Sequence, residues 1–229
     1  MKRSDINRYI REAEGFFRIN HFHLPPFASW SVENWRDKGD EINEILDCEL
    51  GWDITDFGKG NFLKEGLLLF TIRNGLTGSR KYPKPYAEKI MISRENQLTL
   101  MHYHAVKTED IINRAGGRLS FELYCHTEDN QLDGEQTVIV ARDGVRCEVR
   151  PGEKLLLEPG ESISLTPGLY HTFHAENGTG PVMIGEVSFV NDDHTDNICL
   201  EPQLRFPEID EDELPYRLLV CDYGKFLRE

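Results

Sequence analysis

The chain lacks long apolar runs and has few basic residues. Among its 229 residues, 26 are Lys or Arg and 40 are Asp or Glu, giving a formal charge of −14. Nucleic acids and anionic lipids both bind clustered Lys and Arg, so we expect neither a nucleic-acid partner nor a membrane partner. Because no apolar stretch is long enough for a signal peptide or a membrane span, the sequence predicts a cytoplasmic protein.

Cysteine is also scarce. The five cysteines are scattered and their number is odd, which fits neither a disulfide framework nor a zinc ribbon. We therefore expect free thiols in a reducing compartment. The excess of acidic residues favours a small neutral ligand, since a phosphorylated one would enter a negative field.

The N-terminal residues have the pattern of helices. Apolar residues from Ile6 to Phe17 recur at helical spacing, and Ser4 is a candidate N-cap. A second helix is expected from about Val32 to Leu46. The sequence thus predicts a helical arm over residues 1–50.

After residue 51, short β-rich runs alternate with turn sequences. The expected strands are Gly66–Arg73, Ala87–Ser93, Gln97–His104, Leu119–His126, Thr137–Arg142, Cys147–Arg150, Lys154–Leu157, Glu161–Leu165, His171–Ala175 and Pro181–Phe189, with a last strand or edge segment over Leu218–Phe226. Many short strands at this spacing predict an all-β sandwich or barrel over residues 51–229. Arm and barrel together form one predicted domain over residues 1–229.

Four residues combine into a candidate metal site. His102, His104 and Glu109 form His-x-His-x4-Glu, and His171 lies downstream after a glycine-containing turn. Two histidines two positions apart on a strand point to the same side. Three imidazoles and one carboxylate form a ligand set typical of a divalent cation.

The residues from His102 to Gly116 resemble the first cupin motif, and those from Gly160 to His171 resemble the second. Cupins are small jelly-roll β-barrels. The resemblance implies that the three histidines and Glu109 bind a metal inside such a barrel, with the N-terminal helices packed outside it. Thr166 stands where cupins usually have proline, a change in the turn that leaves the ligand unaffected.

Over most of its length the chain is similar to the D-lyxose isomerase family. The stretches that carry the resemblance are 51–58, 107–114, 185–188, 191–193 and 205–209. The resemblance implies a homodimer with a divalent cofactor, preferably Mn²⁺, that converts D-lyxose to D-xylulose and often D-mannose to D-fructose. The residues do not determine the native metal, because Co²⁺, Ni²⁺, Fe²⁺ and Zn²⁺ accept the same ligands. They do not determine the preferred sugar either.

An aldose becomes a ketose when one hydrogen moves from C2 to C1. A divalent cation stabilises the charge of the enediolate, and a base on one face of the cis-enediol carries the proton. Glu186 is the first candidate for this base, because strand alternation allows its side chain to enter the barrel. Lys107 and Lys89 are candidates for the proton donor or for the group that polarises O1. The assignment stays open, since lysine side chains are mostly exposed.

Sugar binding requires polar groups for the hydroxyls and an aromatic wall. Phe173 lies on the same strand face as His171 and is the best aromatic candidate. Asp193, Arg205 and Glu201 are weaker candidates for hydroxyl contacts.

Two other functions stay open. A cupin iron dioxygenase would use the same ligands, and fold does not decide function; turnover without oxygen separates it from an isomerase. A non-enzymatic sugar-binding or transport-accessory protein would be stabilised by sugar without converting it. The complete ligand set with Glu186 favours the isomerase.

Overall fold

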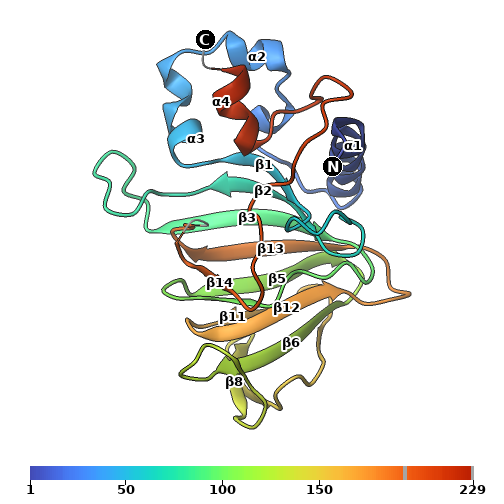
Figure 1. The fold of residues 1–229 in the computed structure, drawn as a ribbon, viewed down its shortest axis with the longest axis vertical. Helices are drawn as coiled ribbons and strands as arrows, with labels where there is room; N and C mark the ends of the chain where they lie inside the picture. The colour runs from blue at the N-terminus through green and yellow to red at the C-terminus, as the bar shows by residue number, and fades with distance from the viewer. Residues whose placement is uncertain (193–194, 228–229) are drawn as a thin grey trace.

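The computed structural model describes residues 1–192 and 195–227, and their strands form two facing sheets (Figure 1). The strands are β1 (Gly51–Thr55), β2 (Leu67–Arg73), β3 (Tyr86–Ser93), β4 (His102–His104), β5 (Glu109–Gly116), β6 (Leu119–His126), β7 (Leu132–Asp133), β8 (Val138–Arg142), β9 (Val145–Val149), β10 (Leu155–Leu157), β11 (Ser162–Leu165), β12 (Leu169–Ala175), β13 (Val182–Phe189) and β14 (Asn197–Cys199). The larger sheet has the order β1-β2-β3-β13-β5-β11-β8-β9. The smaller has the order β10-β6-β12-β4-β14, and β7 pairs with β6.

Strand alternation gives the larger sheet two apolar faces. On one face Leu69 and Met91 pack against Phe121 and Phe173 of the smaller sheet and form the barrel core. On the other face Phe70 and its neighbours pack against helix α1 (Arg3–Ile19). Because side chains alternate with period two, one strand supplies both cores.

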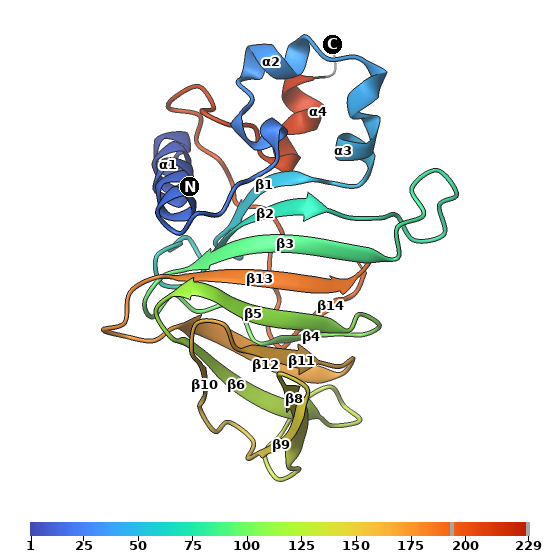
Figure 2. The ribbon, with the colours of Figure 1, turned by 180° about the vertical axis from the view of Figure 1, so that it is seen from behind.

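The helices lie outside the barrel, beside β1 and β2 (Figure 2). Besides α1 they are α2 (Val32–Arg36), α3 (Asn43–Asp47) and α4 (Tyr223–Phe226), with 3-10 turns at Pro26–Ser29, Asp40–Ile42 and Val220–Asp222. A short parallel bridge between Trp52 and Leu219 covers part of the β1 edge. Within the described ranges, no helix combines the length and apolar character that a membrane span requires.

Most of the predicted strands are present within one or two residues of the expected bounds. The run Gln97–His104 is shorter than expected, since only His102–His104 pairs as a strand. The strands β1, β5, β7 and β14 were not predicted.

Three local predictions were wrong. The helix expected over Val32–Leu46 is broken by a turn that contains Gly39, which is a poor helix former. Of the two readings of Leu218–Phe226, the strand is wrong, because the segment forms a 3-10 turn and α4, whereas the edge segment agrees with the bridge between Leu219 and Trp52. Ser4 lies inside α1, where its hydroxyl donates to Asp212, and Lys2 is the N-cap.

A buried ion-pair cluster joins the two ends of the chain. The Arg3 guanidinium is fully buried and donates two hydrogen bonds to Asp222, at 2.9 and 2.7 Å, and two to Glu211, at 2.8 and 2.9 Å. Bidentate pairing of this kind satisfies a charge that would otherwise be costly to bury. The cluster therefore holds α1 against the C-terminal segment.

Replacing Arg3 by Met should lower the free energy of unfolding by about 3–5 kcal/mol, because Asp222 would be left buried without its cation. Arg8→Met is the control, since Arg8 pairs with Asp5 on the exposed side of the same helix, and it should cost less than about 1 kcal/mol. Urea unfolding at neutral pH measures both values. Equal losses in the two variants would contradict the assigned role of Arg3.

The same cluster predicts a loss of stability in acid. The hydrogen bonds from Arg3 lower the pKa of Glu211 from 4.5 to about 2. A depressed pKa stabilises the folded state above pH 4.5, and this contribution disappears as the pH falls from 4.5 towards 2. In urea unfolding measured across this range, Glu211→Gln should be less stable than the wild type at pH 6, and the difference should shrink towards pH 2. A difference in stability that is constant with pH would contradict the proposed link between the pKa of Glu211 and folding. Glu128→Gln, at an exposed position, controls for the loss of a surface carboxylate.

Candidate functional site

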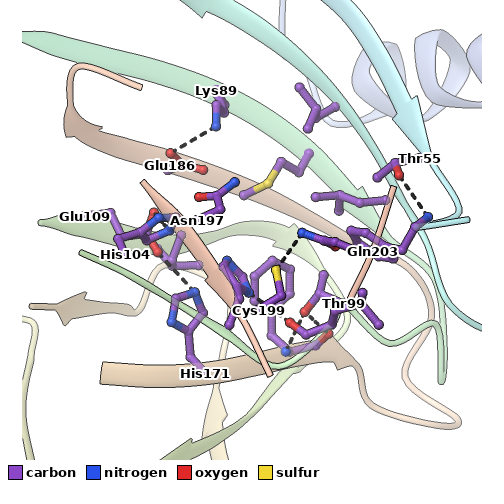
Figure 3. A pocket seen from close by; sticks show the side chains of 18 of the residues that line it. Thr55, Lys89, Thr99, His104, Glu109, His171, Glu186, Asn197, Cys199 and Gln203 are labelled. Atoms are coloured by element: carbon purple, nitrogen blue, oxygen red, sulfur yellow. Dashed lines mark hydrogen bonds and ion pairs between the residues drawn. The ribbon is translucent and has the colours of Figure 1, made fainter. Parts of the chain in front are cut away.

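A cavity between the two sheets collects the polar side chains that point into the barrel. Histidines from β4 and β12 line it, together with acidic and basic residues from β3, β5 and β13 (Figure 3). A further part of the wall comes from β14 and the segment that follows it, through Asn197, Cys199, Gln203 and Arg205.

The three predicted histidines meet in this cavity. His102 and His171 are directly opposite each other on the paired strands β4 and β12, so their side chains share a face. One ring nitrogen each of His102, His104 and His171 lies within 4.8 Å of the others. Such a group can hold a metal ion.

Two of the rings are fixed by backbone carbonyls. The Nδ1 atom of His102 lies 2.8 Å from the carbonyl oxygen of Leu100, and that of His171 lies 3.0 Å from the oxygen of Leu169. A carbonyl only accepts, so Nδ1 of each ring carries a proton and Nε2 is the atom available to a metal. Burial, followed by the neighbouring histidines, lowers the pKa of His102 well below its usual value, and burial also lowers that of His104. Neutral imidazoles with Nε2 directed into the cavity are suitable metal ligands.

Glu109 begins β5 and brings a carboxylate to the histidines. Its two oxygens lie 3.3 Å from Nε2 of His104 and 3.3 Å from Nε2 of His171 (Figure 3). Burial would raise the pKa of Glu109, but the ammonium group of Lys107 outweighs burial and holds it well below the usual range. The carboxylate is therefore ionised, as a hard cation requires.

Lys107 is buried between two carboxylates. Its Nζ atom lies 2.9 Å from Glu109 and 2.9 Å from Glu186. Burial alone would lower the pKa of Lys107, yet the two carboxylates reverse the effect and raise it. The side chain lies inside the site and is not a surface lysine.

Glu186 and Lys89 are directly opposite each other on β13 and β3, and both point inward. The Lys89 Nζ lies 3.5 Å from the Glu186 carboxylate and also donates a hydrogen bond to Asn191. Burial would raise the pKa of Glu186, but Lys107 and Lys89 lower it. Glu186 is thus an ionised carboxylate beside the histidine cluster.

Of the four residues predicted to contact the sugar, two line the cavity. Phe173 and Arg205 line the cavity, and Arg205 is paired with Asp53. Glu201 is not brought to the cavity: its side chain is 68% exposed and forms an ion pair with Lys59. Asp193 lies outside the described residues.

Several cavity residues were not predicted from the sequence. Asn197 and Cys199 line the cavity and face His104 and His102 across the β14–β4 pair, while Asn191, outside the lining, accepts a hydrogen bond from Lys89. These residues belong to the segment after β13, where the sequence does not alternate. Asn191 lies in a stretch that carries the family resemblance, whereas Asn197 and Cys199 were indicated only by their chain position behind Glu186.

Glycine shapes the turn that leads into β12. Gly168 has φ +80°, and a Cβ atom there would lie 2.7 Å from the His126 ring. Its amide donates to the carbonyl of His104 over 2.9 Å. This hydrogen bond attaches the turn before His171 directly to β4, the strand that carries the other two histidines. A larger residue at position 168 would prevent this close approach.

The comparisons with known proteins agree with this geometry. A family model described as D-lyxose isomerase matches residues 1–223. A D-lyxose/D-mannose isomerase from Escherichia coli O157:H7 is 48% identical over 228 residues, which cover 99% of this chain and 100% of that protein. The protein of the same name from Serratia proteamaculans is also 48% identical, over 230 residues, with the same coverage.

Solved structures show the fold. L-ribose isomerase from Cellulomonas parahominis superposes with a TM-score of 0.60 at 13% identity, over 92% of this chain and 98% of that one. L-ribose isomerase from Geodermatophilus obscurus gives a TM-score of 0.56 at 16% identity, with the same coverage. The predicted all-β cupin barrel with N-terminal helices packed outside is confirmed, as a mostly-β fold of the cupin type.

Proposed function

The chain belongs to the D-lyxose isomerase family, and on this basis we propose that it interconverts D-lyxose with D-xylulose and D-mannose with D-fructose. The similarity to the two D-lyxose/D-mannose isomerases supports the choice of sugars. One structural observation carries the proposal: a buried histidine cluster and an ionised Glu186 share one cavity, with Lys107 between Glu186 and Glu109. That arrangement supports a base beside a cation site, a combination suited to proton transfer between adjacent carbons.

We assign His102, His104, His171 and Glu109 as the residues that hold a divalent cation, with Mn²⁺ as the first choice. Three imidazoles and one ionised carboxylate are a donor set that fits such an ion. When bound, the cation would supply positive charge that polarises O1 and O2 of the sugar.

Glu186 acts as the base in the proposed reaction. Its carboxylate takes the proton from C2, the electron pair of that C–H bond forms the C1–C2 double bond of a cis-enediol, and the same group returns the proton to C1. The O2 hydroxyl gives up its proton as the C2 carbonyl forms, and O1 takes one up. Because Glu186 is ionised, its carboxylate is able to accept a proton.

Lys107 and Lys89 keep Glu186 charged and in place. Lys107 is positioned to donate a hydrogen bond to a substrate oxygen, since its ammonium group already lies between Glu109 and Glu186. Phe173 provides an apolar wall, and Arg205 provides hydrogen-bond donors for the distal hydroxyls. A homodimer and a cytoplasmic location complete the proposal, and light scattering of the purified protein checks the first.

The direct test is turnover by metal-restored protein. The chain is stripped with a chelator, reloaded with Mn²⁺ under nitrogen, and D-lyxose is followed to D-xylulose by NMR. Conversion without oxygen supports the isomerase and excludes the dioxygenase alternative. Sugar-dependent stabilisation without conversion would identify a binding protein instead.

His171→Ala should lose Mn²⁺ binding and activity together, because it removes one of three clustered imidazoles. His174→Ala is the matched control: His174 lies on the same strand but on the opposite face, outside the cavity lining. Calorimetric titration with Mn²⁺ measures the affinity of each variant. Unchanged affinity in His171→Ala would remove His171 from the ligand set.

Glu186→Gln should bind Mn²⁺ as the wild type does but lose at least about 100-fold in kcat, the lower end for the loss of a general base. Glu88→Gln, on the adjacent strand and paired with Arg73 at the surface, should keep the wild-type rate. Steady-state kinetics with D-lyxose separate the two. A retained rate in Glu186→Gln would reassign the base, with Lys107 and Lys89 tested next.

A further inference from the structure

His104 differs from the other two histidines of the cluster. His102 and His171 each have a backbone carbonyl at Nδ1, whereas the Nδ1 atom of His104 is buried and, among the described residues, has no hydrogen-bond partner. A buried ring nitrogen without a partner is costly, and a metal-binding histidine normally has an acceptor at its second nitrogen. An acceptor for His104 is therefore to be expected nearby.

Asp196 occupies that position. Its Oδ2 atom lies 3.8 Å from Nδ1 of His104, and its side chain is 9% exposed. Closing this distance by about 1 Å gives an ordinary N–H···O hydrogen bond. A carboxylate only accepts, so it would place the proton on Nδ1 and leave the lone pair on Nε2, the atom that faces Glu109.

Asp196 is itself held firmly by the turn between β4 and β5. Its carboxylate accepts from the amides of Val106, at 2.7 Å, and Lys107, at 3.1 Å. Its backbone carbonyl accepts from the amide of Ala105 at 3.0 Å. Three consecutive amides thus fix Asp196 beside His104, and the same bonds fix the backbone of Lys107.

We propose that Asp196 is a positioning residue for the metal site: it orients the His104 ring for a divalent cation and at the same time fixes the turn that carries Lys107. This inference rests on the proposed metal-dependent function. Asp196 makes no contact with the reacting atoms in this account, and it acts through His104. Losing such an outer partner typically weakens metal binding by about 10–100-fold.

The test is Asp196→Asn in the full-length protein, because the Asn amide oxygen keeps an acceptor for one turn amide while the negative charge is lost. Competition with a chromogenic chelator gives the Kd for Mn²⁺, and thermal unfolding of the metal-free protein gives its stability. Asp143→Asn is the matched control, since Asp143 also accepts two hydrogen bonds in a turn, both from Ser162 at 2.8 Å, but lies between β8 and β9. We expect a Kd about 10–100-fold weaker for Asp196→Asn and no change for Asp143→Asn.

A double-mutant cycle separates positioning from a simple turn-stabilising role. In a His104→Ala background, Asp196→Asn should have no further effect on the Kd, since the ring it orients is gone. An equal effect in both backgrounds, or a Kd within twofold of the wild type, overturns the proposal. Asp196→Ser gives a second reading if the Asn variant does not fold, and the same weakening is expected there.

The proposed metal site is checked independently in the same assay by His102→Ala. If that variant binds Mn²⁺ like the wild type, the metal site itself fails. If it loses binding while Asp196→Asn keeps it, the metal site stands and only the role of Asp196 is rejected.

Discussion

The cavity depends on the ammonium group of Lys107 lying between two buried carboxylates. Glu109 and Glu186 come from adjacent strands, β5 and β13. Without a cation between them, one of the two would take up a proton, because like charges at close range disfavour joint ionisation. With Lys89 included, two ammonium groups balance two carboxylates. In the proposed reaction, the added charge of a divalent cation is then available for the negative charge that develops on the sugar.

The barrel makes this arrangement rigid. The strands that direct Lys89 and Glu186 inward direct their alternate side chains outward onto helix α1, so the same backbone is packed on both faces. The outer helical layer is in turn attached to the C-terminus by the buried Arg3 cluster. Side chains on strands held in this way keep their geometry better than side chains on free loops. The exception is the wall built by β14 and the residues that follow it, and that wall is the part of the cavity in which the chain is least regular.

Alternation and turn sequences made most of the strands predictable, and the spacing of His102, His104, Glu109 and His171 predicted a cluster that the structure brings together. Strand β5 was missed because its polar residues do not alternate with apolar ones. Leu218–Phe226 looked like a strand because it is apolar, but tertiary packing makes it helical. A local sequence pattern cannot show which segment of the chain folds back to cover the edge of a sheet.

The chemistry around Glu186 was only partly predictable. Its strand position indicated an inward side chain, whereas its contact with Lys107 joins residues 79 positions apart and depends on strand order. Glu201 was expected to contact the sugar and instead pairs with Lys59 at the surface, because an irregular segment offers no alternation to argue from. Asp196 was not predicted as a site residue, because it too lies in an irregular segment.

The central claim is that Glu186 carries a proton between C2 and C1 in a reaction that needs no oxygen. The most direct measurement is NMR of D-xylulose formed from D-lyxose by the Mn²⁺-loaded protein in D₂O under nitrogen. The account predicts ketose with deuterium at C1, introduced by exchange of the carboxylic acid proton with solvent. Ketose formed without any solvent deuterium would indicate a hydride shift, and the absence of ketose would contradict the account as a whole.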